Sequence, residues 1–238
     1  MNGTRQVDRR GCCGHVALSQ VDMVIPEDAA PVVQAVALER AAACGVRSVQ
    51  VPPRIAAPAA RRLLRSSCAV ATTSDGVLGW LGASTLRWMS SALTAQRVDE
   101  LIVRADGGAL AADAGVDGQL RRATGLCHAH GTLCVIALSV SSLCAEQVRS
   151  ALHAAVTSSA DTVILEAPAD GIVPGELLAA AVRSASPRTT VRVRARVASV
   201  DAVRDTIAVG ADSVVLRYDD PVMEQLLAQA EQASRAAA

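Results

Sequence analysis

The chain has 238 residues, of which 51% are apolar, so it can bury the core of one large domain or of two small ones. Its formal net charge is zero and only 1% of its residues are aromatic, which argues against a nucleic-acid partner that needs basic patches or stacking platforms. All 23 basic residues are arginine, so the chain has no lysine side chain with which to form a Schiff base.

The N-terminal segment and the cysteines bear on where the protein works. Residues 1–15 lack the apolar core of a signal peptide, and no apolar run is long enough to cross a bilayer. The 7 cysteines are an odd number and include no CxxC pair. We therefore expect a reduced, cytoplasmic protein with no membrane partner. Adjacent Cys12 and Cys13 are interpreted as thiols of a loose arm, although a redox or metal site is the alternative.

Short apolar strands alternate with helical stretches along the chain. The expected strands cover residues 15–25, 46–51, 68–73, 98–105, 133–138, 161–167, 190–197 and 212–218. The expected helices cover residues 26–45, 54–66, 83–96, 111–124, 143–158, 174–185, 200–209 and 221–235. Eight strand–helix units in this length are typical of an α/β protein with a single (β/α)8 TIM barrel. No GxGxxG motif follows the first strand, which argues against a dinucleotide-binding doubly wound sheet.

A weak internal repeat supports the barrel. The segments CGVRSVQVPP (44–53), SADTVILEAP (159–168) and GADSVVLRYDD (210–220) each join a helix end to an apolar strand and then to a polar tip. Such repetition is expected of a fold built from similar units. We expect residues 1–14 to form a flexible N-terminal arm and residues 15–238 to form the barrel.

The stretch VRVRARV, residues 191–197, alternates apolar and basic side chains. In a TIM barrel the outward strand residues pack beneath the helices, whereas the lumen opens to water at the C-terminal ends of the strands. We therefore expect Arg192, Arg194 and Arg196 to point into the lumen. Removing an unpaired charge from water costs several kcal/mol, so these arginines need carboxylates or an anionic ligand.

Five segments, in order along the chain, resemble the deoxyribose-phosphate aldolases, a family of class I aldolase barrels. They are VDELIVRADGGAL (98–110), LCVIALSVSSL (133–143), ADTVILEA (160–167), VRVRA (191–195) and VGADSVVL (209–216). The likeness extends from about Leu18 to Arg217 and implies the same barrel fold.

The resemblance also implies that the family's chemistry is missing. Ile164 stands at the position of the Schiff-base lysine, Arg194 at that of the assisting lysine and Ile102 at that of the proton-relaying aspartate. The family's glycine-rich phosphate loop after the seventh strand is matched by Arg196 and Val197, and glycines there let backbone N–H groups approach a phosphate. The resemblance therefore implies a divergent member without ordinary deoxyribose-phosphate aldolase activity.

Metal chemistry is the other lysine-free route to an aldolase-like reaction. His128 and His130 form an HxH pair, but the pattern places them at the end of the helix before the fifth strand, on the face opposite the active site. We expect no metal and no cofactor. Cys134, which stands at a lysine position of the family's fifth strand, is expected to point inward as a small core residue.

If the strands alternate regularly, ten polar residues line the lumen: Gln20, Asp22, Gln50, Arg104, Asp106, Glu166, Arg192, Arg194, Arg196 and Arg217. We expect the catalytic residues to be Glu166, Asp106 and Arg194, with either carboxylate as the general acid or base. The expected substrate-binding residues are Arg104, Arg196, Arg217, Asp22 and Gln50. An excess of guanidinium groups suits a small carboxylate or phosphate ligand.

Two functional hypotheses follow. The first is a repurposed small-molecule enzyme of lyase, isomerase or cyclase type, which uses arginine and carboxylate groups on an anionic or carbonyl-containing substrate. The second is a catalytically inactive pseudoenzyme that serves as a ligand-binding or partner-binding scaffold. An open lumen in which Glu166 faces Arg194 would favour the enzyme, and a lumen closed by ion pairs would favour the scaffold. Both hypotheses leave room for a homo-oligomer.

Overall fold

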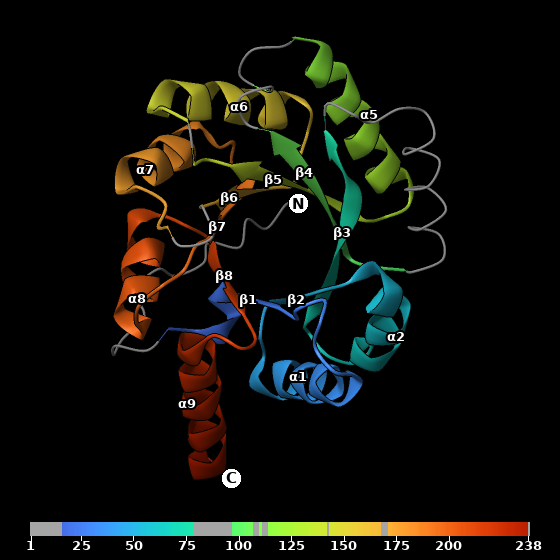
Figure 1. The fold of residues 1–238 in the computed structure, drawn as a ribbon, viewed down its shortest axis with the longest axis vertical. Helices are drawn as coiled ribbons and strands as arrows, with labels where there is room; N and C mark the ends of the chain where they lie inside the picture. Colours follow the sequence, from blue (N-terminus) through green and yellow to red (C-terminus); the bar gives the residue numbers. More distant parts are fainter. Residues whose placement is uncertain are drawn as a thin grey trace, which may run out of the picture.

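The computed structural model describes residues 16–78, 97–106, 110, 114–141, 143–167 and 171–237. This part of the chain forms a closed barrel of parallel strands that follow one another in chain order, with the last strand paired to the first (Figure 1). The strands are β1 (Val21–Val24), β2 (Ser48–Val51), β3 (Ala69–Leu78), β4 (Glu100–Asp106), β5 (Leu133–Ser139), β6 (Thr162–Glu166), β7 (Thr190–Arg194) and β8 (Ser213–Arg217). The expected (β/α)8 TIM barrel is confirmed.

The helices surround the strands, and α9 extends outward beyond the ring (Figure 1). A 3-10 helix, η1 (Leu18–Gln20), precedes β1, and the α-helices within the described residues are α1 (Pro31–Cys44), α2 (Pro53–Leu63), α5 (Ala114–Ala129), α6 (Ala145–Thr157), α7 (Gly175–Ser184), α8 (Val200–Val209) and α9 (Pro221–Ala237). The helix expected over 83–96 and the arm expected over 1–14 lie outside the described residues.

Several boundaries differ from the expected ones. The strand expected over 15–25 is η1 followed by β1, the strand expected over 190–197 ends at Arg194, and the helix expected over 111–124 is α5. The first helix begins at Pro31 and not at Pro26, because a proline excludes the helical conformation in the residue before it, and Ala30 is accordingly extended. Gly45 ends this helix as expected, in the left-handed conformation with φ 70°. The third strand continues to Leu78, five residues beyond its expected end.

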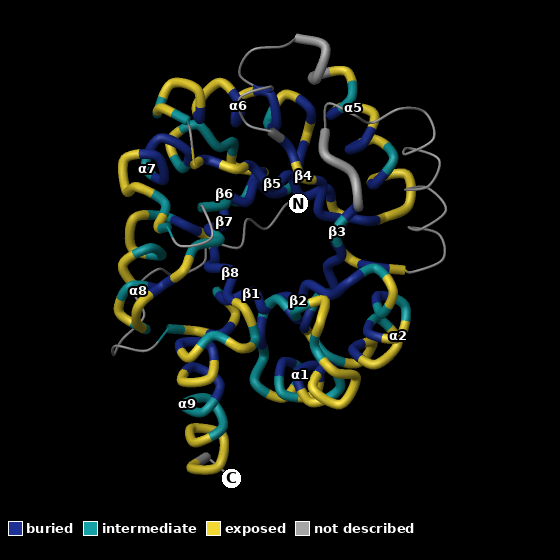
Figure 2. Tube along the Cα trace, viewed as in Figure 1, coloured by how far each residue is buried: buried dark blue, intermediate teal, exposed yellow. Residues whose placement is uncertain are grey.

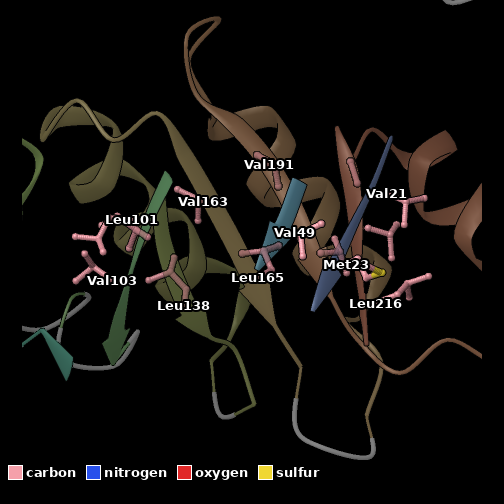
Figure 3. Close-up of a cluster of buried hydrophobic side chains, with 14 of the residues drawn as sticks. Val21, Met23, Val49, Leu101, Val103, Leu138, Val163, Leu165, Val191 and Leu216 are labelled. Carbon is pink, nitrogen blue, oxygen red and sulfur yellow. The ribbon is translucent and has the colours of Figure 1, made fainter. Parts of the chain in front are cut away.

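The main hydrophobic core lies between the barrel and its helices. The strands are mostly buried, while the outer faces of the helices are exposed (Figure 2). Outward-facing strand residues such as Val163, Leu165 and Val191 belong to this layer (Figure 3). Because side chains alternate along a strand, their neighbours Ile164 and Arg192 point the other way, into the lumen. The expected orientation of the β7 valines and arginines is thus confirmed.

A smaller apolar cluster fills the middle of the lumen. It consists of Ala71, Ile102, Val135, Ala137, Ile164 and Val215. Ile102 and Ile164, the positions at which the aldolase resemblance implies an aspartate and a lysine, are among its members and are at most 2% exposed. The wall of the lumen at this level therefore consists of hydrocarbon.

The fifth strand corrects one expectation. Cys134 does not point inward, because the lumen-facing residues of β5 are its neighbours Val135 and Ala137. Its Sγ accepts a hydrogen bond from Thr124 Oγ1 of α5 at 3.5 Å, so the thiol lies between strand and helix. The strand LCVIALS is nearly continuous in apolar residues, and such a run does not indicate which face is which.

Two segments of the internal repeat, 159–168 and 210–220, have a structural counterpart at the starts of β6 and β8, and the start of β4 shares it. Asp212, just before β8, donates its backbone N–H to Val191 O at 2.8 Å, and its Oδ2 accepts the Val191 N–H at 2.8 Å. Asp99 forms the same pair of bonds with Val70, and Asp161 forms it with Cys134. Each aspartate thus fastens the beginning of its own strand to the preceding one.

Candidate functional site

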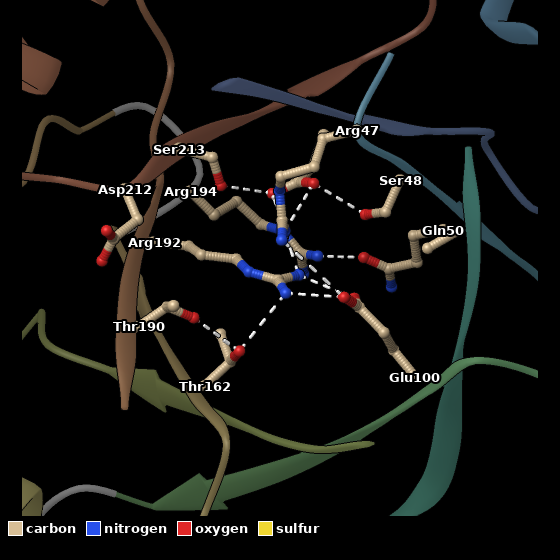
Figure 4. A network of polar contacts seen from close by, with 12 residues as sticks. Arg47, Ser48, Gln50, Glu100, Thr162, Thr190, Arg192, Arg194, Asp212 and Ser213 are labelled. Atoms are coloured by element: carbon tan, nitrogen blue, oxygen red, sulfur yellow. Dashed lines mark hydrogen bonds and ion pairs between the residues drawn. The ribbon is translucent and has the colours of Figure 1, made fainter. Parts of the chain in front are cut away.

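The N-terminal end of the lumen is filled by a buried ionic network (Figure 4). Asp22 of β1 is 2% exposed and accepts hydrogen bonds from Ser48 Oγ at 2.7 Å and Ser213 Oγ at 2.6 Å. Arg47 Nη2 lies 2.6 Å from one oxygen of Asp22 and 2.8 Å from the other. Ser48 and Ser213 are the first residues of β2 and β8, which places the network at the end of the barrel opposite the strand C-termini.

Arg192 and Glu100 form the second half of the network. Arg192 donates from Nη1 and Nη2 to the two oxygens of Glu100 at 2.7 and 2.6 Å, a bidentate arrangement, and Nη2 also reaches Thr162 Oγ1 at 3.2 Å. Both partners are 2% exposed. Weaker contacts of 3.8 Å, from Arg192 to Asp22 and from Arg47 to Glu100, join the two pairs. Two guanidinium groups and two carboxylates neutralise one another here.

The electrostatics of Asp22 follow from these neighbours. Burial alone raises the pKa of a carboxyl group, but the charges of Arg192 and Arg47, together with hydrogen bonds from Arg47 and Ser213, outweigh burial. They hold the pKa of Asp22 below its usual value. Asp22 is therefore an ionised part of this network at the N-terminal end of the lumen, which we call the floor. Both of its carboxylate oxygens accept hydrogen bonds from protein side chains.

The C-terminal end of the lumen is open. A cavity of about 550 Å³ lies there, and Arg104, Arg194, Arg196 and Arg217 contribute to its lining. The rest of its lining is partly polar, with Gln50, Asp219 and Asp220, and partly apolar, with Val24, Ala167, Ala195, Val215 and Pro221. A second cavity of about 410 Å³ over β1–β3 shares Gln50, Arg104 and Arg217 with the first, so the two are parts of one mouth.

Arg194 is the deepest arginine of the mouth. It is the last residue of β7, directly across from Glu166, the last residue of β6. Its Nη1 donates to Glu166 Oε1, and its Nη2 donates to Gln50 Oε1 (Gln50 and Arg194, Figure 4). Burial lowers the pKa of the Arg194 guanidinium below its usual value; nearby Arg104 lowers the pKa further, whereas Glu166 raises it.

The other mouth arginines are more exposed. Arg104 of β4 faces the lumen, and no other described residue forms an ion pair with it. Arg196 lies just beyond the end of β7. Arg217, at the end of β8, donates to both oxygens of Asp219 at 2.9 and 2.8 Å, which offsets its charge.

The structure brings most of the predicted site residues together and separates one. The residues at the mouth are Gln50, Arg104, Glu166, Arg194, Arg196 and Arg217. Asp22 belongs to the floor network and lines neither cavity. Asp106 ends β4, but its side chain lies outside the described part of the structure. Gln20 lies in η1 and not in a strand.

Sequence reasoning missed Arg47 and Glu100. Glu100 has the same parity along β4 as Arg104, so strict alternation would have placed it in the lumen. Arg47 lies just before the first residue of β2, so the alternation of side chains along the strand does not predict where its side chain points. The repeat offers one signal, since Arg47 occupies the position that Asp99, Asp161 and Asp212 take before their strands. Its side chain departs from their pattern by reaching Asp22.

His128 of the HxH pair lies at the end of the barrel opposite the mouth. His128 lies in the last turn of α5, and its Nε2 is 2.8 Å from Asp161 Oδ2, at the N-terminal end of the barrel. Within the described ranges, no group of three or more His, Cys, Asp or Glu residues is arranged to hold a metal ion. None of the described helices is both long and apolar enough to span a membrane.

Known structures share this architecture. A protein assigned as a deoxyribose-phosphate aldolase from Coccidioides immitis superposes with a TM-score of 0.77 over 91% of this chain and 87% of its own, at 14% identity. The fold is that of the deoxyribose-phosphate aldolases. A tetrameric deoxyribose phosphate aldolase from Aeropyrum pernix gives a TM-score of 0.66 at 16% identity, with 84% of this chain and 86% of its own covered.

The same architecture occurs in other small-molecule enzymes. The N-acetylmannosamine-6-phosphate 2-epimerase of Clostridium perfringens superposes with a TM-score of 0.61 over 94% of this chain and 98% of its own, at 12% identity. No protein-family model matches the sequence, and no curated protein matches it. At these identities the likeness establishes the fold, while function has to be argued from the site.

Proposed function

We propose that the chain is a lysine-independent small-molecule enzyme that binds an anionic substrate at the C-terminal mouth of the barrel. The observation that carries the proposal is a 550 Å³ cavity lined by Arg104, Arg194, Arg196 and Arg217, with Glu166 paired to the deepest of them. Active sites of TIM barrels lie at this face. The positions that the aldolase resemblance assigns to catalysis, Ile102 and Ile164, are apolar here, so the chemistry must come from the rim.

The arginines support binding of a carboxylate or phosphate. Planar guanidinium groups donate to such anions through two parallel hydrogen bonds. Arg104 and Arg194 lie close enough for Arg104 to lower the pKa of Arg194, and like charges so near each other are stabilised by an anion between them. Apolar Val24 and Val215 in the same wall lower the local dielectric, which strengthens these interactions.

Glu166 supplies the acid–base group. Its carboxylate accepts a proton from a substrate carbon next to a carbonyl group and returns that proton to another atom of the same substrate. A neighbouring guanidinium group stabilises the negative charge that develops on the carbonyl oxygen. Such a step needs no cofactor, oxidant or amine and covers lyase, isomerase and cyclase reactions. The unpaired thiols of the five described cysteines are in keeping with the cytoplasm as the site of this activity.

One observation favours a second candidate, a barrel that binds the same anion without turning it over. The lower lumen is closed by ion pairs, and Glu166 itself is engaged by Arg194. A pseudoenzyme with this site would bind the ligand, and Glu166→Gln would then change no rate.

The first experiment is a thermal-shift screen of small carboxylates, sugar phosphates and aldehydes. A ligand at a hundred times its Kd stabilises the folded state by about 2.7 kcal/mol, which raises Tm by roughly 5–10 °C in a domain of this size. We expect an anion to produce this shift in the wild type and in Arg183→Met, an exposed control on α7, but not in Arg104→Met. No shift with any anion would contradict the proposal.

The second experiment separates the enzyme from the pseudoenzyme. Anionic carbonyl compounds that stabilise the protein are incubated with it in deuterated water, and exchange of the proton next to the carbonyl is followed by NMR. We expect exchange with the wild type and a loss of at least a hundredfold in Glu166→Gln. Binding without exchange would establish the second candidate.

A further inference from the structure

The pairing of Glu166 with Arg194 has a consequence for how the site operates. The two residues are register partners at the ends of β6 and β7, and both side chains point into the mouth. Arg194 lines the cavity, whereas Glu166 does not line it and contacts the cavity through Arg194; their side chains are 21% and 16% exposed. An anion that enters the cavity therefore meets Arg194 with a carboxylate already in place.

The remaining contacts hold Arg194 in position without Glu166. Gln50 Oε1 accepts from Nη2 of Arg194, and Gln50 Nε2 donates to Thr73 Oγ1 at 2.7 Å. Arg194 Nη1 bonds to Glu166 on the other side of the guanidinium group. A guanidinium group fixed on one side by a neutral amide can exchange the anion on its other side while it stays where it is.

We propose that Glu166 occupies the anion position on Arg194 in the ligand-free protein, and that the anionic group of the substrate displaces it and thereby releases it for proton transfer. The inference rests on the proposed function and adds the control of its catalytic base. In the ligand-free protein Glu166 is masked, because its Oε1 is engaged by Arg194 Nη1. When the ligand anion replaces it, the Glu166 carboxylate is released from Arg194 and becomes available to the substrate.

This exchange makes the anionic group a requirement for reaction as well as for binding. One anion replaces another on Arg194, so the charge of the pair is unchanged, and Arg104 supplies the extra attraction that favours the incoming group. A neutral carbonyl compound can enter the cavity but cannot displace Glu166. Among anionic and neutral compounds of similar shape, only the anionic ones should therefore release the base.

The test measures the affinity for inorganic phosphate by titration calorimetry. Glu166→Gln removes the competing charge with nearly the same shape, and we expect its Kd for phosphate to be at least tenfold lower than that of the wild type. Glu166→Asp keeps the charge but shortens the side chain, so its Kd should lie between the two. Glu27→Gln removes a carboxylate that lines the second cavity without touching Arg194, and its Kd should change less than twofold.

The outcomes separate this inference from the function on which it rests. If phosphate binds the wild type and Arg104→Met weakens it, but Glu166→Gln binds no more tightly than Glu27→Gln, the displacement is overturned and the anion site stands. If Glu166→Asp matches the wild type while Glu166→Gln is tighter, charge alone is responsible and displacement is again overturned. If phosphate binds neither the wild type nor Glu166→Gln, both proposals fail.

Discussion

Arg192 and Arg194 stand two residues apart on one face of β7, and their surroundings give them different tasks. Arg192 is 2% exposed and bonded to both oxygens of Glu100, whereas Arg194 borders the cavity. A buried ion pair contributes little compared with apolar side chains of the same size, but breaking it leaves an uncompensated charge inside the protein. The first arginine is therefore structural and the second is available to a ligand.

Replacing Arg192 with Met should destabilise the fold by about 3–5 kcal/mol, because Glu100 is left charged and buried. The double variant Arg192→Met, Glu100→Met removes both charges and leaves the Asp22–Arg47 pair intact. We expect it to be less destabilised than the sum of the two single variants by at least about 2 kcal/mol. Urea denaturation of the four proteins measures this coupling, and additive costs would contradict the network.

The lowered pKa of Asp22 predicts a pH dependence. The unfolded carboxyl group takes up a proton near pH 3.9. The folded group does so only at lower pH, so its contribution to stability is complete above the unfolded pKa and is lost as pH falls through the folded pKa. We expect Asp22→Asn to be less stable than the wild type at pH 7 and to lose less of its remaining stability below about pH 4. Equal acid slopes in urea titrations would refute this assignment.

At the scale of elements, the sequence predicted the two faces of a strand only where polar and apolar residues alternate along it. The valine–arginine alternation of β7 predicted both of its faces correctly, because a charged guanidinium group is excluded from the apolar layer beneath the helices and valine is not. The apolar run of β5 contains no such contrast, and Cys134 was placed on the wrong face. Glu100 was missed although its parity with Arg104 indicates the lumen, whereas its pairing with Arg192, 92 residues away in sequence, is shown by no local pattern.

The aspartates before β4, β6 and β8 should contribute to stability by fastening adjacent strands. Asp212→Ala removes the acceptor of the Val191 N–H and should cost about 1.5–3 kcal/mol, the range for a hydrogen bond to a charged group. Asp205→Ala, at an exposed position of α8, is the matched control and should change stability by less than about 0.5 kcal/mol. Equal effects of the two substitutions on the urea midpoint would contradict this role.

The ends of α1 and α8 give a second comparison at this scale. Gly45 has φ 70° with open space around its Cα, whereas Gly210 has φ 122° and a Cβ there would lie 2.9 Å from Val182 Cγ1. Gly45→Ala should cost about 1–2 kcal/mol for the left-handed backbone alone. Gly210→Ala adds the collision with α7 and should cost at least about 1 kcal/mol more. The reverse order in thermal unfolding would show that α7 yields to the added methyl group.

At the scale of the whole molecule, the two ends of the lumen use their charges differently, because the floor network is buried and the mouth is open. The floor network is neutral, since Arg47 and Arg192 balance Asp22 and Glu100. The mouth carries four arginines together with Asp219 and Asp220, and Arg194 pairs with Glu166 and Arg217 with Asp219. The sequence pattern predicted the lumen arginines, and it placed Arg194, Arg196 and Arg217 toward the mouth because they fall late on their strands. The pairing of Arg192 with Glu100 across the floor has no local signal.

The most direct test of the anion site is the position of an anion in crystals soaked with arsenate, a tetrahedral ion whose arsenic is located by anomalous scattering. We predict a peak in the mouth within hydrogen-bonding distance of Arg104 and Arg194, with the Glu166 side chain moved off Arg194. Arsenic found only at arginines on the outer helices, with the mouth empty and the Glu166–Arg194 pair intact, would contradict the account.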